Sequence, residues 1–346
     1  MKDFPRKSKM SLIVLGIETS CDETAAAVVT KEGAILSNIV FSQIKDHVPF
    51  GGVIPEVSAR NHLSALRHIV LEAMSQSGIS FDQLDGVAAT CGPGLIGGVL
   101  VGAMMGKSIA AFHQKPFLAV NHLEGHALTA RLTDKVKFPY LLLLVSGGHT
   151  QLIHVLDVGN YKVLGTTLDD AVGECFDKVA KMLDLPYPGG PALEKIAETG
   201  NSKRFLFPKP LFHTSACDFS FSGLKTAVRY EIEKLKPMDD VTKADVAASF
   251  QAAIVGVLEK KVTLALEKNS DLKTFVVAGG VGANTSIRLA LQGVCRSQGI
   301  SFVAPPISLC TDNGAMIAWA GLEHLRKGDI SQLDFMPRPR WPLAPS

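Results

Sequence analysis

The sequence lacks the cysteine spacing that would define a disulfide-rich or zinc-stabilised protein. Six cysteines are scattered over 346 residues, and no two of them form a CxxC pair. Neither a disulfide framework nor a structural zinc site is therefore expected. We predict instead that all of them are small buried side chains in a reducing compartment, namely Cys21, Cys91, Cys175, Cys217, Cys295 and Cys310.

The sequence also lacks an apolar run long enough to span a membrane. Its most apolar helical stretch, residues 94–106, ends at Lys107, well short of the roughly 20 residues that a spanning helix needs. The N-terminal MKDFPRKSKM is basic, but it contains an acid and a proline and has no apolar core. We therefore expect residues 1–11 to be a flexible leader rather than a secretion signal, and the protein to be cytoplasmic.

A strong excess of one charge is missing as well. The chain has 35 lysines and arginines against 33 aspartates and glutamates, a formal net charge of +2. A protein that coats nucleic acid by itself normally carries a larger positive charge. Any nucleic-acid partner must therefore be bound through a local basic face or with the help of other proteins.

What the sequence does contain is a regular alternation of apolar strands and helices. A strand, a polar turn and a second strand occur near residues 12–30, and the same plan returns near residues 140–156. This repetition predicts an α/β fold of two duplicated lobes with mostly buried sheets. We expect the first lobe at 12–127 and the second at 128–325, with an irregular and helical insertion around 195–245. A tail at 326–346 is expected to pack back on the first lobe.

The segment NHLEGH contains two histidines four residues apart, His122 and His126. On a helix such residues share a face, with Cβ atoms about 5–6 Å apart, so both imidazoles can reach one metal ion. Two polar or core histidines are an equally good reading of the spacing. Asp312 is the candidate third ligand, because it lies at a strand–loop–helix junction. Two histidines and one carboxylate suit Fe²⁺ or Zn²⁺, and sequence chemistry does not choose between them.

Glu124 separates this segment from the HExxH signature of metalloproteases. That signature needs a glutamate directly after the first histidine, where this chain has Leu123. Glu124 lies two positions on, turned roughly 200° around the helix from His122. Gly125 also weakens a helix at this point. A metallopeptidase is therefore disfavoured, although it stays an alternative.

Glycine-containing or polar turns follow three apolar strands, in GIETSCDET, VSGGHT and AGGVGAN. The glycine turns present backbone N–H groups to an anion without a Cβ in the way. One such turn is usually only a turn, but three in a two-lobed α/β chain favour a nucleotide or phosphorylated ligand between the lobes. None matches the P-loop or GxGxxG pattern, which disfavours a Walker ATPase and an ordinary Rossmann enzyme.

Four further residues are weaker candidates for contacts with a ribose. Carboxylates accept hydrogen bonds from ribose hydroxyls, and a Gly/Pro loop lets a backbone approach a ligand closely. A solvated helix face followed by a turn explains the same spacing slightly better. The candidates are Glu174, Asp177, Gly190 and Glu194.

Eight segments together resemble the TsaD (formerly Gcp) family of bacterial tRNA threonylcarbamoyltransferases, in content and in order. The match runs from about residue 12 to the C-terminus. The segments are GIETSCDETAAAVV, NHLEGH, LVSGGHTQL, GECFDKVAKMLDLPYPGGPALE, DFSFSGLKTAV, VVAGGVGAN, CTDNGAMIAWAG and RPRWPLA.

The resemblance implies the actin-like fold of Hsp70 and sugar kinases (ASKHA), with two lobes around a nucleotide cleft. It implies transfer of the threonylcarbamoyl group from L-threonylcarbamoyladenylate to N6 of adenosine-37, next to the anticodon of tRNAs reading codons that begin with A. The products are t6A and AMP. The alternatives are a metallopeptidase, the old label of this family, a sugar-kinase-like phosphotransferase and a non-enzymatic scaffold.

The resemblance also implies roles for individual residues. The metal ligands are His122, His126 and Asp312, with Fe²⁺ the usual ion and Zn²⁺ the alternative. No general base is implied. Leu144 stands where archaeal and eukaryotic relatives have tyrosine, so no phenolate ligand is expected, and Gly282 replaces a serine found in many bacterial members. The implied substrate-binding residues are Leu144, Val145, Ser146, Gly147, Gly148, Asp177, Gly190, Glu194 and Asn284.

Finally, the resemblance implies partners. The family works with TsaB, a shorter paralogue that forms a heterodimer with it, and with TsaE, an ATPase. The adenylate comes from a TsaC-type synthase. The near-neutral charge then predicts that the chain alone binds tRNA weakly. We expect the small-residue helix within residues 94–106 to lie at the contact with TsaB.

Overall fold

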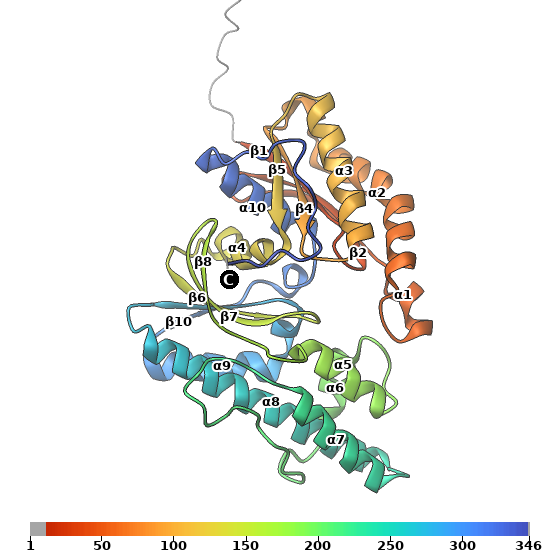
Figure 1. The fold of residues 1–346 in the computed structure, drawn as a ribbon, viewed down its shortest axis with the longest axis vertical. Coiled ribbons are helices and arrows are strands. Elements are labelled where there is room, and N and C mark those ends of the chain that lie inside the picture. Colours follow the sequence, from red (N-terminus) through yellow and green to blue (C-terminus); the bar gives the residue numbers. More distant parts are fainter. Residues whose placement is uncertain (1–11, 345–346) are drawn as a thin grey trace, which may run out of the picture. The chain divides into compact units, whose positions relative to one another are not determined.

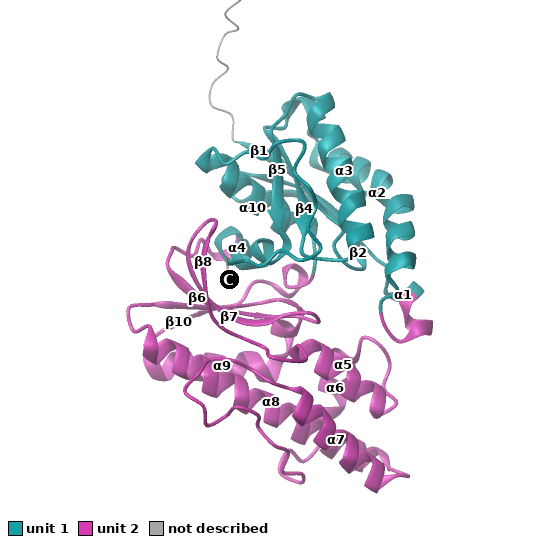
Figure 2. Cartoon of the chain, in the orientation of Figure 1, with its two compact units in different colours: residues 1–46, 53–132, 312–345 teal, residues 47–52, 133–311, 346 magenta. Residues whose placement is uncertain are grey.

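The computed structural model describes residues 12–344 (Figure 1). The predicted leader, residues 1–11, lies outside the described residues. The chain divides into two compact units (Figure 2). Of the described residues, unit 1 contains 12–46, 53–132 and 312–344, and unit 2 contains 47–52 and 133–311. This division assigns the start of the last helix to unit 1, whereas the sequence-based ranges place it in the second lobe.

Unit 1 is built on a five-stranded sheet in the order β3-β2-β1-β4-β5. The first three strands form an antiparallel meander, and β4 and β5 add to β1 in parallel. β1 and β4 are buried along their whole length. The strands are β1 (Ile13–Glu18), β2 (Glu23–Thr30), β3 (Ile35–Ser42), β4 (Gly86–Gly92) and β5 (Phe117–Asn121).

Unit 2 repeats this topology, with a five-stranded sheet in the order β10-β9-β6-β7-β8. Again three strands form an antiparallel meander, and two more, β9 and β10, extend the sheet in parallel. The predicted α/β duplication is thus confirmed in strand order and direction. The strands are β6 (Tyr140–Val145), β7 (Thr150–Asp157), β8 (Asn160–Thr166), β9 (Thr274–Ala278) and β10 (Ser301–Val303).

Helices α2 (Pro55–Ser77), α3 (Ile96–Phe112) and α10 (Gly314–Lys327) pack against the sheet of unit 1. Helix α4 (His122–Asp134) lies against α10, where a Cβ on Gly125 would be 2.9 Å from the Ile317 side chain. The short helix α1 (Ile44–His47) follows β3. The apolar spacing in α2 predicts a helix correctly, and Leu66, Val70 and Met74 are buried. Leu63 belongs to the same pattern but is 72% exposed.

The helices of unit 2 enclose a large apolar core around Phe176, Phe219 and Phe250. They are α5 (Val172–Met182), α6 (Gly189–Ala197), α7 (Ser222–Leu235), α8 (Asp240–Lys268) and α9 (Thr285–Gln298). The expectation that no apolar run is long enough to span a membrane is wrong for helix α8, which is long and apolar enough to do so. However, 72% of its most apolar window is buried within the protein. Short 3₁₀ turns lie at Val48–Phe50, Phe81–Gln83, Gly280–Ala283 and Ile307–Leu309.

The C-terminal segment lies along unit 1. The Arg338 backbone N–H donates to the Cys91 carbonyl at 2.7 Å, and the Gly94 N–H donates to the Pro339 carbonyl at 3.2 Å. The Asn121 side chain donates to the Trp341 carbonyl at 3.1 Å. These bonds tie the end of the chain to the ends of β4 and β5.

The six cysteines are free, as the sequence predicts, and all but the half-buried Cys21 are buried. Burial raises the pKa of the Cys91, Cys175 and Cys295 thiols to about 12. These three are therefore protonated at neutral pH, as expected of inert packing residues.

Gly16 tests the packing of α10 on β1. A Cβ on Gly16 would lie 2.2 Å from the Ala318 backbone nitrogen, so α10 would have to move. We expect Gly16→Ala to lower the free energy of unfolding by about 1–3 kcal/mol, measured by chemical denaturation. Gly293→Ala is the control, because Gly293 lies in exposed α9 with open space around it, and it should stabilise by about 0.5–1 kcal/mol. Equal effects of the two substitutions would contradict this account.

Candidate metal centre

The chain passes from β5 directly into α4, and this junction places the two histidines of NHLEGH. The Asn121 side chain accepts a hydrogen bond from the Leu123 N–H at 2.9 Å and so caps the start of the helix. His122 is the first helical residue and His126 follows one turn later. Their rings lie edge to face with centroids 4.8 Å apart, and both are buried.

Asp312 lies just before α10, next to the residue that caps it. The Asn313 side chain accepts a hydrogen bond from the Met316 N–H at 3.0 Å. Asp312 Oδ1 lies 3.0 Å from His126 Nε2 and 3.5 Å from His122 Nε2. One ligand atom from each of the three residues lies within 4.8 Å of the others, so this group can hold a metal ion.

The chemistry of this donor set fits a divalent cation. Two imidazole nitrogens and one carboxylate oxygen leave coordination positions open, and the Asp312 side chain is 19% exposed. Burial alone would lower the pKa of His122, but the charges of Asp312 and Glu18 and the hydrogen bond with Glu18 outweigh it and raise the pKa to about 9. The centre therefore favours positive charge at the place where a cation would be bound.

Glu18 belongs to this centre, although our sequence reasoning did not assign it a role. It is the last residue of β1 and is fully buried. Its Oε2 lies 3.0 Å from His122 Nδ1 and accepts a hydrogen bond from the Thr90 hydroxyl at 2.6 Å. Its Oε1 accepts from the Ser20 N–H at 2.5 Å. The signal in the sequence is an acid at the end of a wholly apolar strand, a pattern that also suits the start of a polar turn.

Glu124 points away from the metal donors, as the helical geometry predicts. Its Oε2 lies 2.8 Å from His324 Nε2 on α10, and His324 Nδ1 lies 2.8 Å from Asp329 Oδ2. Glu124 is thus held in an ion pair and is not placed as a base beside the metal. This arrangement speaks against the metallopeptidase alternative.

The first group of predicted substrate-binding residues lies at the end of β6 in unit 2. Leu144 and Val145 are buried strand residues. Ser146 begins the turn to β7, and its hydroxyl accepts a hydrogen bond from the His149 N–H at 3.1 Å. A Cβ on Gly147 or on Gly148 would meet no atom within 4 Å. The backbone of this turn is therefore open to a ligand.

The remaining predicted residues of unit 2 form two pairs. Asp177 Oδ1 accepts hydrogen bonds from the Gly189 and Gly190 N–H groups at 2.9 and 3.2 Å. The carboxylate of this α5 residue therefore lies at the start of α6. Glu194 Oε1 accepts from the Thr285 N–H at 2.7 Å, beside Asn284.

Asn284 has a structural role of its own. It caps α9 by accepting from the Ile287 N–H at 3.0 Å, and its amide donates to Gln251 at 2.9 Å. Glu174, the remaining ribose candidate, forms a partly exposed ion pair with Lys178 at 2.5 Å. The structure thus brings Asp177 to Gly190 and Glu194 to the segment of Asn284, while Glu174 pairs with a surface lysine.

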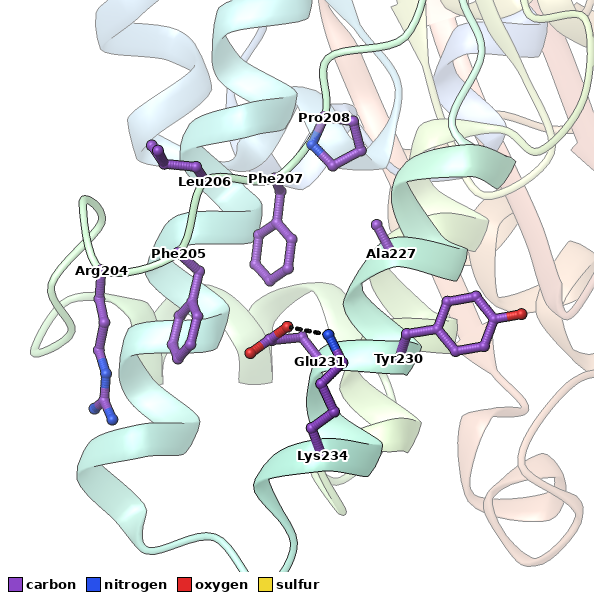
Figure 3. Close-up of a pocket in the computed structure, with 9 residues that line it drawn as sticks. All are labelled: Arg204, Phe205, Leu206, Phe207, Pro208, Ala227, Tyr230, Glu231 and Lys234. Carbon is purple, nitrogen blue, oxygen red and sulfur yellow. Dashed lines mark hydrogen bonds and ion pairs between the residues drawn. The ribbon is translucent and has the colours of Figure 1, made fainter.

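A separate hollow of about 540 Å³ lies on unit 2, between the segment 204–208 and α7. Figure 3 shows the rings of Phe205 and Phe207 pointing toward the Glu231–Lys234 ion pair, while Leu206 points away. None of the predicted site residues lines it.

Sequence comparison gives a family match over most of the chain. Residues 34–319 match the family model described as "TsaD: tRNA N6-adenosine threonylcarbamoyltransferase". Proteins of that name from Brucella anthropi and Brucella canis are each 56% identical over 340 residues, which covers 95% of this chain and 95% of each relative.

Solved structures support the fold. HypF of T. kodakarensis gives a TM-score of 0.63 at 14% identity, covering 92% of this chain and 48% of HypF. Component A of the Acidaminococcus fermentans (R)-2-hydroxyglutaryl-CoA dehydratase gives 0.51 at 15% identity, covering 91% of this chain and all of that one. At such identities the likeness concerns the fold alone, and it agrees with the predicted ASKHA class.

His324 should make stability depend on pH. Burial lowers its pKa, but the hydrogen bond and charge of Glu124, with those of Asp329, outweigh this and raise the pKa to about 9. A pKa raised on folding gives stability that is complete below the unfolded value of about 6.5 and is lost as pH rises through about 9. We expect this loss to be on the order of 3 kcal/mol. The free energy of unfolding is measured by chemical denaturation at pH 6 to 10. His324→Gln should flatten its dependence on pH, and a pH dependence equal to that of the wild type would contradict the prediction.

Proposed function

The chain belongs to the tRNA N6-adenosine threonylcarbamoyltransferase family, and we infer that His122, His126 and Asp312 hold the divalent metal ion of its reaction. The enzyme transfers the threonylcarbamoyl group from L-threonylcarbamoyladenylate to N6 of adenosine-37 in tRNAs reading codons that begin with A. AMP leaves and t6A is formed. The observation that carries the metal proposal is the convergence of three donor atoms within 4.8 Å.

The two-histidine, one-carboxylate set suits Fe²⁺ or Zn²⁺, and we propose Fe²⁺ because it is the ion that the family resemblance implies, with Zn²⁺ as the alternative. When bound, such an ion supplies Lewis-acid polarisation of the carbamoyl carbonyl and a template for the substrate. The partial exposure of Asp312 leaves one side of the centre accessible to that substrate.

The residues of unit 2 are proposed to hold the adenylate. The turn of Ser146, Gly147 and Gly148 follows Leu144 and Val145. The Ser146 N–H already donates to the His149 carbonyl at 2.8 Å, so the N–H groups proposed to bind the phosphate are those of Gly147 and Gly148. Asp177, Gly190, Glu194 and Asn284 are proposed to contact the nucleoside. Because the acyl carbon is already activated as a mixed anhydride with AMP, positioning of the two reactants supplies much of the catalysis. We assign no general base.

We propose TsaB as the partner bound on α3 and TsaE as the further component, in a cytoplasmic complex fed by a TsaC-type synthase. The small residues of α3 face inward, since Gly98, Gly102, Ala103 and Gly106 are buried, so they cannot form the contact themselves. The outward side instead carries large apolar residues four or eight positions apart. We call this the α3 stripe, consisting of Ile96, Leu100, Met104 and Phe112, which are 45%, 40%, 54% and 82% exposed.

The metal centre is tested in a reconstituted reaction with tRNA, threonine, bicarbonate, ATP and the partner proteins, scored by mass spectrometry of t6A. We expect Asp312→Ala and His122→Ala to lower the rate about 100-fold or more, because each removes a ligand. Stripping the metal with a chelator should have the same effect, and re-adding Fe²⁺ should restore activity.

The same variants separate the alternatives. A non-enzymatic scaffold would keep both complex assembly and t6A formation after Asp312→Ala. A metallopeptidase would cleave glycoprotein with added metal and lose that cleavage in His122→Ala. A phosphotransferase would show magnesium-dependent transfer from ATP to a sugar. Full t6A formation by both ligand variants would overturn the proposed metal site.

The α3 stripe is tested by charge substitution. Met104→Glu and Leu100→Glu should abolish co-purification with TsaB, because a charge would be buried in an apolar contact. Leu289→Glu on α9 is the matched control, since Leu289 is 63% exposed but lies off the stripe, and it should leave co-purification intact. Retained binding by both stripe variants would exclude this surface as the contact.

A further inference from the structure

We propose that Glu18 is a positioning residue of the metal centre, which fixes the ring of His122 so that its Nε2 faces the ion. The proposal rests on the metal site proposed above and adds a residue to it. Glu18 does not coordinate the ion itself, because the atom it reaches is Nδ1, on the other side of the imidazole, at 3.0 Å.

The hydrogen bonds around Glu18 leave its carboxylate little freedom. Oε1 accepts from the Ser20 N–H and Oε2 from the Thr90 hydroxyl. The side chain is fully buried at the end of β1, the strand that lies between β2 and β4 in the sheet. A buried carboxylate is costly unless it is paired, and His122 is the titratable group within hydrogen-bond distance of it.

In the neutral form of His122, which is the form that can bind an ion, this geometry determines which nitrogen carries the proton. An ionised carboxylate only accepts hydrogen bonds, so Nδ1 must be the donor to Glu18. The lone pair is then on Nε2, the atom that lies 3.5 Å from Asp312 Oδ1. A partner of this kind orients a ligating histidine and makes it more basic. The Ser20 hydroxyl, 3.1 Å from Nδ1, can donate or accept and adapts to either form.

The two histidine ligands differ in this respect. His126 Nδ1 is buried and has no hydrogen-bond partner among the described residues. Of the two histidines, His122 is therefore the one whose tautomer is fixed by a neighbouring side chain, that of Glu18. The negative charge of Glu18 also adds to that of Asp312, so the pair balances the two charges of a divalent ion.

Glu18→Gln keeps the shape of the side chain but removes its negative charge and replaces one acceptor oxygen with an N–H donor group. With its oxygen on the Ser20 N–H, the new amide would offer N–H groups to Thr90 and to His122 Nδ1. The proton of His122 would then move to Nε2, the position needed for the ion. We expect Co²⁺, titrated into the full-length protein without tRNA or nucleotide and followed by its visible absorption, to bind about 10–100-fold more weakly.

Glu124→Gln is the matched control. Glu124 is also a buried carboxylate paired with a histidine, at 2.8 Å, but its partner His324 lies outside the metal centre. The control should bind Co²⁺ as the wild type does. If wild-type protein binds no Co²⁺, or if His122→Ala binds it equally well, the metal site itself is wrong. If His122→Ala loses the ion while Glu18→Gln keeps wild-type affinity, only the role of Glu18 is overturned.

A measurement on the wild-type chain avoids dependence on the folding of the variant. In zinc-loaded protein, ¹⁵N NMR of the histidine rings should show the His122 proton on Nδ1. A proton on Nε2, with Nδ1 bound to zinc, would overturn the proposal even if Glu18→Gln could not be purified.

Discussion

The proposed metal centre depends on the close approach of α10 to the first sheet. Asp312 and His126 are 186 positions apart in the sequence, and only this packing brings them to 3.0 Å. Gly16 and Gly314 make it possible, because a Cβ on Gly314 would lie 2.5 Å from the Ala26 carbonyl carbon. The start of α10 is thereby held against β1 and β2, and the carboxylate before it reaches the histidines of α4.

Once the elements are packed in this way, the electrostatics of unit 1 follow. Glu18 and Asp312 flank His122. Burial, Asp312 and Asp22 raise the pKa of Glu23 to about 10, so this carboxyl is neutral at pH 7. Burial also raises the pKa of Glu18, but the charge and hydrogen bond of His122 outweigh it and lower the pKa. Glu18, with its lowered pKa, therefore keeps its negative charge beside His122, where a cation gains from it.

Local patterns in the sequence predict the parts of this centre that depend on one element. The spacing of His122 and His126 follows from a single helix, and the capping residues around Asp312 from a single helix start. Glu18 could not be assigned in this way, because its partner lies 104 positions away and an acid at a strand end also suits a turn. Leu63 is wrongly predicted to be buried. It fits the apolar spacing of α2, but that spacing does not say which side of the helix the rest of the protein covers.

The small residues of α3 show why composition alone misleads about surfaces. Their spacing suits close contact with another backbone, and we assigned that contact to a partner protein. In the structure the backbone is the chain's own: a Cβ on Gly98 would lie 2.3 Å from the Thr19 carbonyl oxygen, and the Thr19 hydroxyl donates to the Gly98 carbonyl at 2.8 Å. Thr19 directly follows Glu18. The helix whose outer side carries the α3 stripe therefore also packs, on its inner side, against the residue that follows Glu18, and the lack of a side chain at Gly98 is what allows this close approach.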